Sequence, residues 1–269
     1  MSEERIPVVL SIAGSDSGGG AGIQADLKAF ARCGVHGTTA ITAITAQNTR
    51  AVEMVEAVSP ELVFGQILAI AEDIRADAVK IGMLGSPEAI DAVAVGLTYV
   101  GVALAPVVID PVMVAESGAV LLDDETRAAM VEALLPRAAV ATPNIPEARV
   151  LTGLGEGVAQ EELARGVLEL GPQAVVVTGG HSDGLIDLFC DGKRVVEISG
   201  ERHPDGGSHG SGCTHSSALA AFLAHGFEPL EAAQRAREVA SEAVANGLRG
   251  IGGGPGPVDV IGLASKRPQ

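Results

Sequence analysis

Short apolar runs alternate with longer amphipathic segments over most of this chain. Most runs are continuous, contain β-branched residues and stop at a glycine or a polar residue, which is typical of a buried strand. They occupy residues 8–12, 37–46, 52–58, 78–84, 106–113, 138–143 and 174–178. Helices are predicted at 23–32, 60–74, 123–135, 211–224 and 229–248, and in segments that open at Pro87 and Asn144. The alternation predicts a single α/β domain over residues 1–269, with a largely parallel sheet and a C-terminal tail from about residue 250.

One pair of segments departs from the parallel pattern. Residues 184–190 and 193–199 are less apolar and flank Asp191-Gly192, a dipeptide typical of a β-hairpin turn. The other strands end in glycine-rich or polar stretches. Because open α/β sheets bind ligands beyond the carboxyl ends of their strands, these stretches are expected to form the functional site.

Composition and charge narrow the class of protein. Hydrophobic residues make up 47% of the chain and aromatic residues only 2%, so the core must consist of Ala, Val, Ile and Leu. The formal net charge of −16 argues against a nucleic-acid or anionic-membrane surface, since both need a concentrated positive field. The sequence shows no run of ~18 apolar residues and no secretory signal, which predicts a cytoplasmic protein. The three cysteines form no C-x-x-C pair, so neither a disulfide framework nor a zinc site is indicated.

A glycine-rich stretch leads directly into the helix predicted at residues 211–224. The loop amides and the first-turn N–H groups of such a helix form an anion site, and phosphate is the usual ligand there. Cys213 lies in that first turn, where the pKa of a thiol is commonly lowered, so that a thiolate could accept a proton. The alternative is that Ser211 caps the helix and Cys213 is a small buried hydrophobic residue.

Three further clusters follow predicted strands. Residues 14–22 contain a second glycine loop, which matches neither the Rossmann fingerprint nor a P-loop; the alternative is a flexible turn. Gln47, followed by Asn48 and Thr49, offers an amide donor and acceptor for the edge of a heterocycle such as an aminopyrimidine, or else belongs to a solvated turn. Asn144 and Glu147 have the spacing of a capping box, which would account for them without a ligand.

Seven segments resemble, in order, those of the hydroxymethylpyrimidine and phosphomethylpyrimidine kinases of thiamine biosynthesis, within the ribokinase-like superfamily. The segments are residues 13–26, 45–49, 80–84, 110–113, 142–147, 179–181 and 209–214. The resemblance implies a ribokinase-like three-layer α-β-α sandwich and a homodimer. It also implies an ATP- and Mg²⁺-dependent kinase that phosphorylates 4-amino-5-hydroxymethyl-2-methylpyrimidine and then its monophosphate.

The same resemblance assigns roles to individual residues. Gly210, Ser211 and Gly212 would form the anion hole for the transferred phosphoryl group, and Cys213 would take the proton of the substrate hydroxyl. It assigns Gln47, Gly20, Asp26, Met83 and Val112 to binding of the pyrimidine. It assigns Thr178, Gly180, His209 and Asp110 to binding of the nucleotide, and Asn144 and Glu147 to magnesium.

The chain also departs from the family pattern, and other functions stay open. Thr178 stands where many relatives have a lysine, residues 204–208 lack a common Asn-Thr pair, and the span after His181 is short; all three bear on ATP binding. A pyridoxal kinase and a non-catalytic pyrimidine-binding protein are the alternatives within the same fold. Residues 206–210 also match the G-x-S-x-G motif of serine hydrolases, with Ser208 as nucleophile, but the charged, proline-containing segment before them is a poor buried strand.

Overall fold

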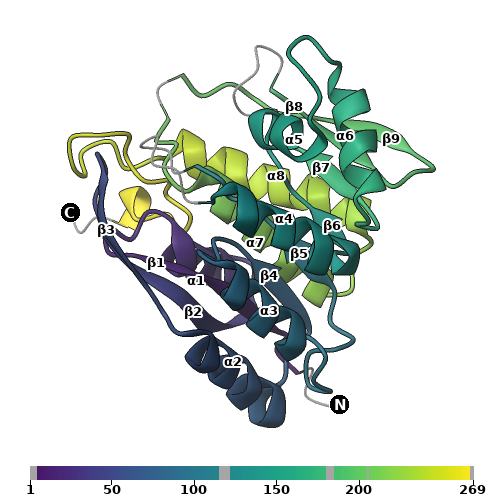
Figure 1. Cartoon of the computed structure of the whole chain (residues 1–269). Helices are drawn as coiled ribbons and strands as arrows, with labels where there is room; N and C mark the ends of the chain where they lie inside the picture. The colour runs from purple at the N-terminus through teal and green to yellow at the C-terminus, as the bar shows by residue number, and fades with distance from the viewer. Residues whose placement is uncertain (1–4, 115–121, 180–184, 205, 267–269) are drawn as a thin grey trace.

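A single twisted sheet forms the centre of the molecule (Figure 1). The computed structural model describes residues 5–114, 122–179, 185–204 and 206–266. Within them the sheet has nine strands, in the order β3-β2-β1-β4-β5-β6-β7-β8-β9. The strands are β1 (Val8–Asp16), β2 (His36–Gln47), β3 (Val52–Ala57), β4 (Ala78–Ile81), β5 (Val107–Ile109), β6 (Val140–Ala141), β7 (Val175–Val177), β8 (Ile186–Cys190) and β9 (Val195–Ser199).

The middle of the sheet is parallel and its two edges are antiparallel. Strands β2, β1, β4, β5, β6 and β7 pair in parallel, whereas β3 returns along β2, and β8 and β9 form the predicted hairpin beside β7. All the parallel strands therefore end at one edge, where the polar stretches of the sequence are brought together.

Helices cover both faces of the sheet, as predicted for a three-layer sandwich. Successive residues of a strand point to opposite faces, so Val9 packs with α1, α7 and α8, and Leu10 packs with the helices of the other face. The first face carries α1 (Gly22–Arg32), α7 (Ser211–Ala224) and α8 (Pro229–Ala245); the second carries α2 (Pro60–Ala69), α3 (Pro87–Gly96), α4 (Asp124–Ala133), α5 (Ile145–Thr152) and α6 (Gln160–Glu169). Helix α2 continues into a π-helical turn, Ile70–Ile74, and short 3₁₀ turns lie at Leu135–Arg137 and Ala264–Lys266.

The core consists of small aliphatic side chains. Helix α7 buries a row of alanines, including Ala218, Ala220 and Ala221, against the sheet, and Phe30 of α1 is one of the few large side chains enclosed there. Short side chains let helices approach the sheet closely, which explains how a chain so poor in aromatic residues forms a dense core. None of the described helices is long and apolar enough to cross a membrane.

Some strand ends differ from the prediction. Strand β1 runs on to Asp16, with an irregularity in its pairing with β2 between Ala13 and Ser15, so that the first part of the expected glycine loop is extended backbone. Strand β5 stops at Ile109, because its partner β4 ends at Ile81 and no parallel neighbour continues the ladder. Helix α7 begins and ends at the predicted residues.

Candidate active site

A cavity of about 900 Å³ opens at the carboxyl ends of the parallel strands. Its walls come from the strand ends, the first glycine loop, the start of α7 and the cavity-facing side of α8. The sequence-predicted residues that line it are Gln47, Met83, Asp110, Val112, Asn144, Glu147, Thr178, His209, Gly210, Ser211, Gly212 and Cys213. Residues from distant parts of the chain therefore meet in one site, as the position of their strand ends predicted.

The start of α7 has the geometry of an anion site. Gly210 is the N-cap residue, in the left-handed conformation with φ of 86°, and no side chain caps the helix. A Cβ at this position would lie 1.8 Å from the carbonyl oxygen of Gly20, so both conformation and space require glycine. The alternative in which Ser211 is the cap is wrong, because Ser211 is the first helical residue. The N–H group of Ser211 donates to the carbonyl of Ser208 (3.0 Å). The N–H groups of Gly212 and Cys213, which have no partner within the helix, belong to residues that line the cavity.

The thiol of Cys213 does not show the lowered pKa expected at a helix start. Burial raises its pKa to about 12, and the carboxylates of Asp26 and Asp110 contribute in the same direction. The charge of Lys80 and an N–H group of Gly22 only partly offset these effects. The half-buried thiol is therefore protonated at neutral pH in the free protein, because desolvation outweighs the helix terminus.

Asp26 does not line the cavity, contrary to its predicted contact with substrate. It is fully buried, accepts hydrogen bonds from Ser11 (2.6 Å) and Ser217 (2.7 Å), and lies 3.0 Å from the ammonium group of Lys80. The prediction failed because the ionic partner of Asp26 lies 54 residues away in the sequence. Lys80 does line the cavity, although the sequence shows it only as a charged residue within an apolar run and predicts no role for it.

Two carboxylates lie on the cavity wall near the start of α5. Glu147 and Asn144 form the predicted capping box, with hydrogen bonds of 2.8 and 2.9 Å, so the structural explanation of this pair is confirmed. Burial, followed by the charge of Asp110, raises the pKa of Glu147 to about 8. Burial also raises the pKa of Asp110, although Lys80 and a 2.9 Å hydrogen bond from Ser216 oppose the shift. A cation at this place would relieve the repulsion between the two carboxylates.

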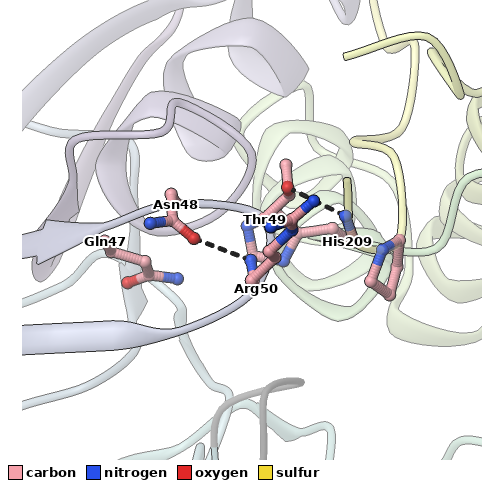
Figure 2. A pocket seen from close by; sticks show the side chains of 7 residues that line it. Gln47, Asn48, Thr49, Arg50 and His209 are labelled. Atoms are coloured by element: carbon pink, nitrogen blue, oxygen red, sulfur yellow. Dashed lines mark hydrogen bonds between the residues drawn. The ribbon is translucent and has the colours of Figure 1, made fainter. Parts of the chain in front are cut away.

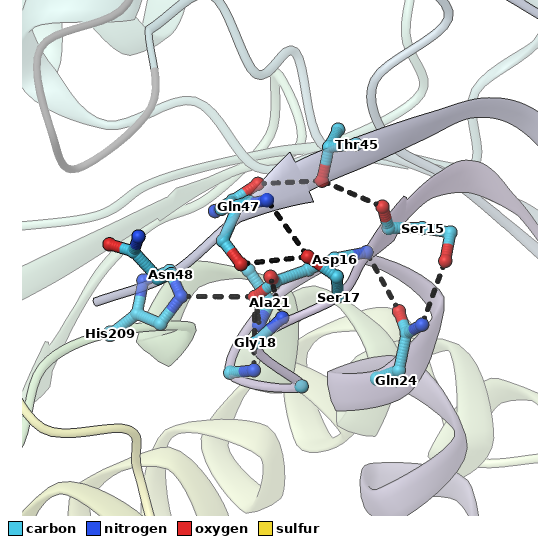
Figure 3. Close-up of polar contacts among 12 residues, drawn as sticks. Ser15, Asp16, Ser17, Gly18, Ala21, Gln24, Thr45, Gln47, Asn48 and His209 are labelled. Carbon is cyan, nitrogen blue, oxygen red and sulfur yellow. Dashed lines mark hydrogen bonds and ion pairs between the residues drawn. The ribbon is translucent and has the colours of Figure 1, made fainter. Parts of the chain in front are cut away.

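Gln47 lies at the end of β2, beside the first glycine loop (Figure 3). The hydroxyl of Thr45 donates a 3.2 Å hydrogen bond to the amide oxygen of Gln47, and the hydroxyl of Ser17 bonds to the backbone of Gln47. The amide NH₂ group has no hydrogen bond to the described residues drawn around it. Gln47 therefore presents a donor to the cavity, and it also borders a smaller pocket of about 250 Å³ with His209 and Pro255 (Figure 2).

The residues predicted for the nucleotide side lie in different parts of the structure. Thr178 pairs with Asn144 through an isolated β-bridge and lines the cavity. His209 also lines it, but its ring lies against Gly20 and bonds to Asp16, both in the first glycine loop. Gly20 is itself buried beneath that ring and does not line the main cavity. Gly180 lies outside the described residues.

Among the polar residues of the cavity wall that sequence reasoning missed, Asp187, His215 and Arg237 form a cluster. Asp187 accepts a 2.9 Å hydrogen bond from the backbone of Gly179 and lies 3.4 Å from Arg237 and 3.9 Å from His215. Within the described part of the chain, neither ring nitrogen of His215 has a hydrogen-bond partner. The sequence signal was a histidine among the small residues of the first half of α7.

Comparison with known proteins places this chain in a family. The model of the family described as phosphomethylpyrimidine kinase matches residues 16–259. A hydroxymethylpyrimidine/phosphomethylpyrimidine kinase of Rhizobium meliloti is 48% identical over 257 residues, which cover 93% of this chain and 96% of that relative.

Solved structures agree with the fold. A pyridoxal kinase from Staphylococcus aureus in complex with pyridoxal superimposes with a TM-score of 0.87 at 32% identity, covering 98% of this chain and 97% of the other. A phosphomethylpyrimidine kinase from Clostridium difficile gives a TM-score of 0.77 at 39% identity, with coverage of 89% and 100%. The family model, the sequence identity and the shared fold lead to one conclusion: the chain belongs to the phosphomethylpyrimidine kinase family.

Proposed function

We propose that this protein transfers the terminal phosphoryl group of ATP to 4-amino-5-hydroxymethyl-2-methylpyrimidine and then to the resulting monophosphate, in the synthesis of thiamine. The observation that carries the proposal is the shared cavity. The start of α7, the side-chain amide of Gln47 and the carboxylates of Asp110 and Glu147 all belong to residues that line it. Phosphoryl transfer depends mostly on positioning and on charge neutralisation, which these groups supply.

The pyrimidine is proposed to lie between the first glycine loop and the ends of β2, β4 and β5. Gln47 would donate to a ring nitrogen through its amide, while Met83 and Val112 pack on the ring faces. The thioether of Met83 lies beside Gly14, where it fills the space that a side chain would occupy. These contacts would direct the hydroxymethyl group toward the start of α7.

In the transfer step, the alcohol oxygen attacks the terminal phosphorus, the bond from phosphorus to the bridging oxygen breaks, and ADP leaves. Gly210, Gly212 and Cys213 would hold the transferred group with their amides, and Ser211, whose N–H group donates to the carbonyl of Ser208 (3.0 Å), would join them only if that bond opened. The sulfur of Cys213 would take the proton of the alcohol. Since its pKa is raised in the free protein, Cys213 can act as a base only when positive charge in the loaded site offsets the carboxylates around it.

Asn144, Glu147 and Asp110 fit a magnesium site shared with the nucleotide. No group of three or more His, Cys, Asp or Glu side chains in the described residues could hold a metal ion. Mg²⁺ often binds one or two carboxylates together with water and substrate phosphates, which suits this pair. When bound, Mg²⁺ would neutralise charge on the phosphates and on the two carboxylates. A Glu147→Gln variant should need several-fold more Mg²⁺ for half-maximal activity, whereas an unchanged requirement would count against this assignment.

A homodimer in the cytoplasm, binding neither nucleic acid nor membrane, completes the proposal. Strands β2 and β3 expose Ile44, Met54 and Val55 at one edge of the sheet, with exposed fractions of 56%, 72% and 50%. An apolar group at a sheet edge suits self-association. Light scattering should give twice the mass of the chain, and Met54→Glu should shift it toward the monomer.

Pyridoxal is the alternative substrate, and the similarity to the Staphylococcus aureus pyridoxal kinase favours testing it. A pyridine ring with a hydroxymethyl group could occupy the same space and meet the same Gln47 amide. The products formed from ATP with each alcohol should be identified by mass spectrometry. The pyrimidine diphosphate as product supports the proposal, whereas pyridoxal phosphate alone would replace it with the alternative.

A further inference from the structure

Asp16 organises the first glycine loop. Asp16 is the last residue of β1 and is only 3% exposed. Its carboxylate accepts hydrogen bonds from the backbone N–H groups of Gly18 (2.7 Å), Gly20 (3.0 Å) and Ala21 (2.8 Å) (Figure 3). Burial alone would raise the pKa of Asp16, but the hydrogen bonds from His209 and from the amides of Ala21 and Gly18 lower it below its usual value. A charged carboxylate therefore holds this loop at neutral pH.

His209 connects that carboxylate to the second glycine loop. Its Nε2 atom lies 3.1 Å from Oδ2 of Asp16, although the two residues are 193 positions apart. The ring fills the space above Gly20, where a Cβ atom would lie 2.1 Å from it. The next residue, Gly210, is the N-cap of α7 and touches the carbonyl of Gly20. The two glycine loops are therefore in direct contact at the point where the anion site begins.

The backbone of His209 is held from the other side by the C-terminal segment. Its N–H group donates to the carbonyl of Gly256 (3.3 Å), and its carbonyl accepts from the N–H group of Val258 (3.1 Å). The amide of Gly254 in the same segment donates to the hydroxyl of Thr49 (3.2 Å), which lies two residues beyond the end of β2 (Figure 2). A movement of the first glycine loop would therefore displace the ring of His209 or strain the hydrogen bonds of the His209 backbone.

We propose that the Asp16–His209 pair couples the two halves of the site, so that seating the aromatic alcohol under the first glycine loop positions the amides of residues 210–213 for the phosphoryl group. His209 is then a positioning residue and not a nucleotide contact. The inference deepens the proposed function and rests on it. Because coupling between two ligands is reciprocal, nucleotide should tighten the binding of the alcohol by the same factor as the alcohol tightens the binding of nucleotide.

Calorimetry on the full chain tests the coupling without turnover. The Kd of 4-amino-5-hydroxymethyl-2-methylpyrimidine is measured with and without saturating Mg²⁺ and a non-hydrolysable ATP analogue. In the wild type the analogue should lower this Kd by about 5-fold or more, within the usual range of coupling between sites. In His209→Ala the ratio should fall to about 1, while the Kd of the analogue alone changes little. His225→Ala, at the other end of α7, is the matched control and should keep the wild-type ratio.

Two further variants separate coupling from folding. Asp16→Asn removes the charge, and His209→Gln keeps an N–H donor on a side chain of similar reach. Asp16→Asn should lose the coupling, His209→Gln should keep part of it, and the double variant Asp16→Asn/His209→Ala should be no worse than either single change. If His209→Ala fails to fold, Asp16→Asn and His209→Gln test the inference through the same ratio of pyrimidine Kd values without and with the analogue.

Two results would overturn the inference. One is a wild-type ratio of about 1; the other is a folded Asp16→Asn or His209→Ala variant with the wild-type ratio. The proposed function fails in a different way, through absence of pyrimidine binding to the wild type, which would overturn both. Coupled binding without phosphorylation would remove the proposed function alone.

Discussion

The ammonium group of Lys80 lies 3.0 Å from the carboxylate of Asp26, and both side chains are completely buried. Burial, the largest single effect, would lower the pKa of Lys80, but the charges of Asp26, Cys213 and Asp110 and the hydrogen bond to Asp26 together outweigh it, and the pKa is raised. Lys80 therefore stays protonated, and it presents at the cavity wall, which Cys213 also lines, a positive charge that Asp26 balances from behind.

Removing one partner of this pair should be costly, since it leaves the other charge buried and uncompensated. Lys80→Met should lower the free energy of unfolding by about 3–5 kcal/mol, as measured by urea denaturation. The double variant Lys80→Met/Asp26→Asn should lose less than the sum of the single variants, because it leaves no unpaired charge. A loss below about 1 kcal/mol in Lys80→Met would show that the pair is not a stabilising element.

Alkylation should report the raised pKa of Cys213. With a pKa of about 12, the thiolate fraction rises tenfold for each pH unit between 7 and 10, so the rate of reaction with iodoacetamide should rise without a plateau. Modification of Cys213 is followed by peptide mass spectrometry, which separates it from Cys33 and Cys190. A plateau at or below the ordinary thiol pKa would contradict the desolvated environment described above.

Gln47→Ala should affect one substrate only. Loss of the amide donor should raise the KM for the pyrimidine about 10-fold, the equivalent of about 1.4 kcal/mol, and leave the KM for ATP nearly unchanged. Gln173→Ala, which truncates an exposed amide outside the cavity wall, is the control. Equal losses for both substrates would mean that Gln47 supports the site as a whole and does not recognise the pyrimidine.

His215 should make stability depend on pH. Burial and, less strongly, Arg237 lower its pKa, although Asp187 opposes the shift. Below the ordinary pKa of about 6.5, the His215 imidazole is protonated in the unfolded chain but stays neutral in the folded protein. Since the unfolded state then binds more protons, the free energy of unfolding falls as the pH drops from 7 toward 5.

Replacement by an apolar residue should remove that contribution. Between pH 7 and pH 5, the free energy of unfolding of His215→Leu should fall less steeply than that of the wild type. The two slopes should differ by up to about 1.4 kcal/mol per pH unit. Denaturation curves at both pH values measure this difference. Identical slopes in the two proteins would show that the protonation of His215 is not linked to folding.

Local patterns in the sequence predicted most of the fold. Helix α7 was placed to the residue, because a glycine loop before it and an alanine-rich face within it mark both its start and its packing. The hairpin at Asp191-Gly192 was predicted for the same reason, since the signal for a tight turn lies in two adjacent residues. Strand ends were less certain, because they depend on where a neighbouring strand stops.

The sequence predicted those residues of the candidate site that follow strands. It did not predict the positions of residues that are set by an ion pair with a distant partner. Gln47, Asp110 and Glu147 reach the cavity because strand ends meet at one edge of the sheet. Asp26 and His209 were assigned to ligands, but they pair with Lys80 and Asp16, and no local pattern reveals partners so far apart. The cluster of Asp187, His215 and Arg237 combines residues of three elements, which only the folded chain brings together.

The most direct test of the proposed kinase is steady-state consumption of ATP with Mg²⁺, measured separately with the hydroxymethylpyrimidine, its monophosphate and pyridoxal. The wild type should turn over the first two, and Cys213→Ala should lose about 10²-fold or more of that rate while keeping the affinity for the pyrimidine. If the pyrimidine binds but neither it nor its monophosphate is phosphorylated, the protein is not the proposed kinase. A Cys213→Ala variant as active as the wild type would instead remove the thiol from the mechanism.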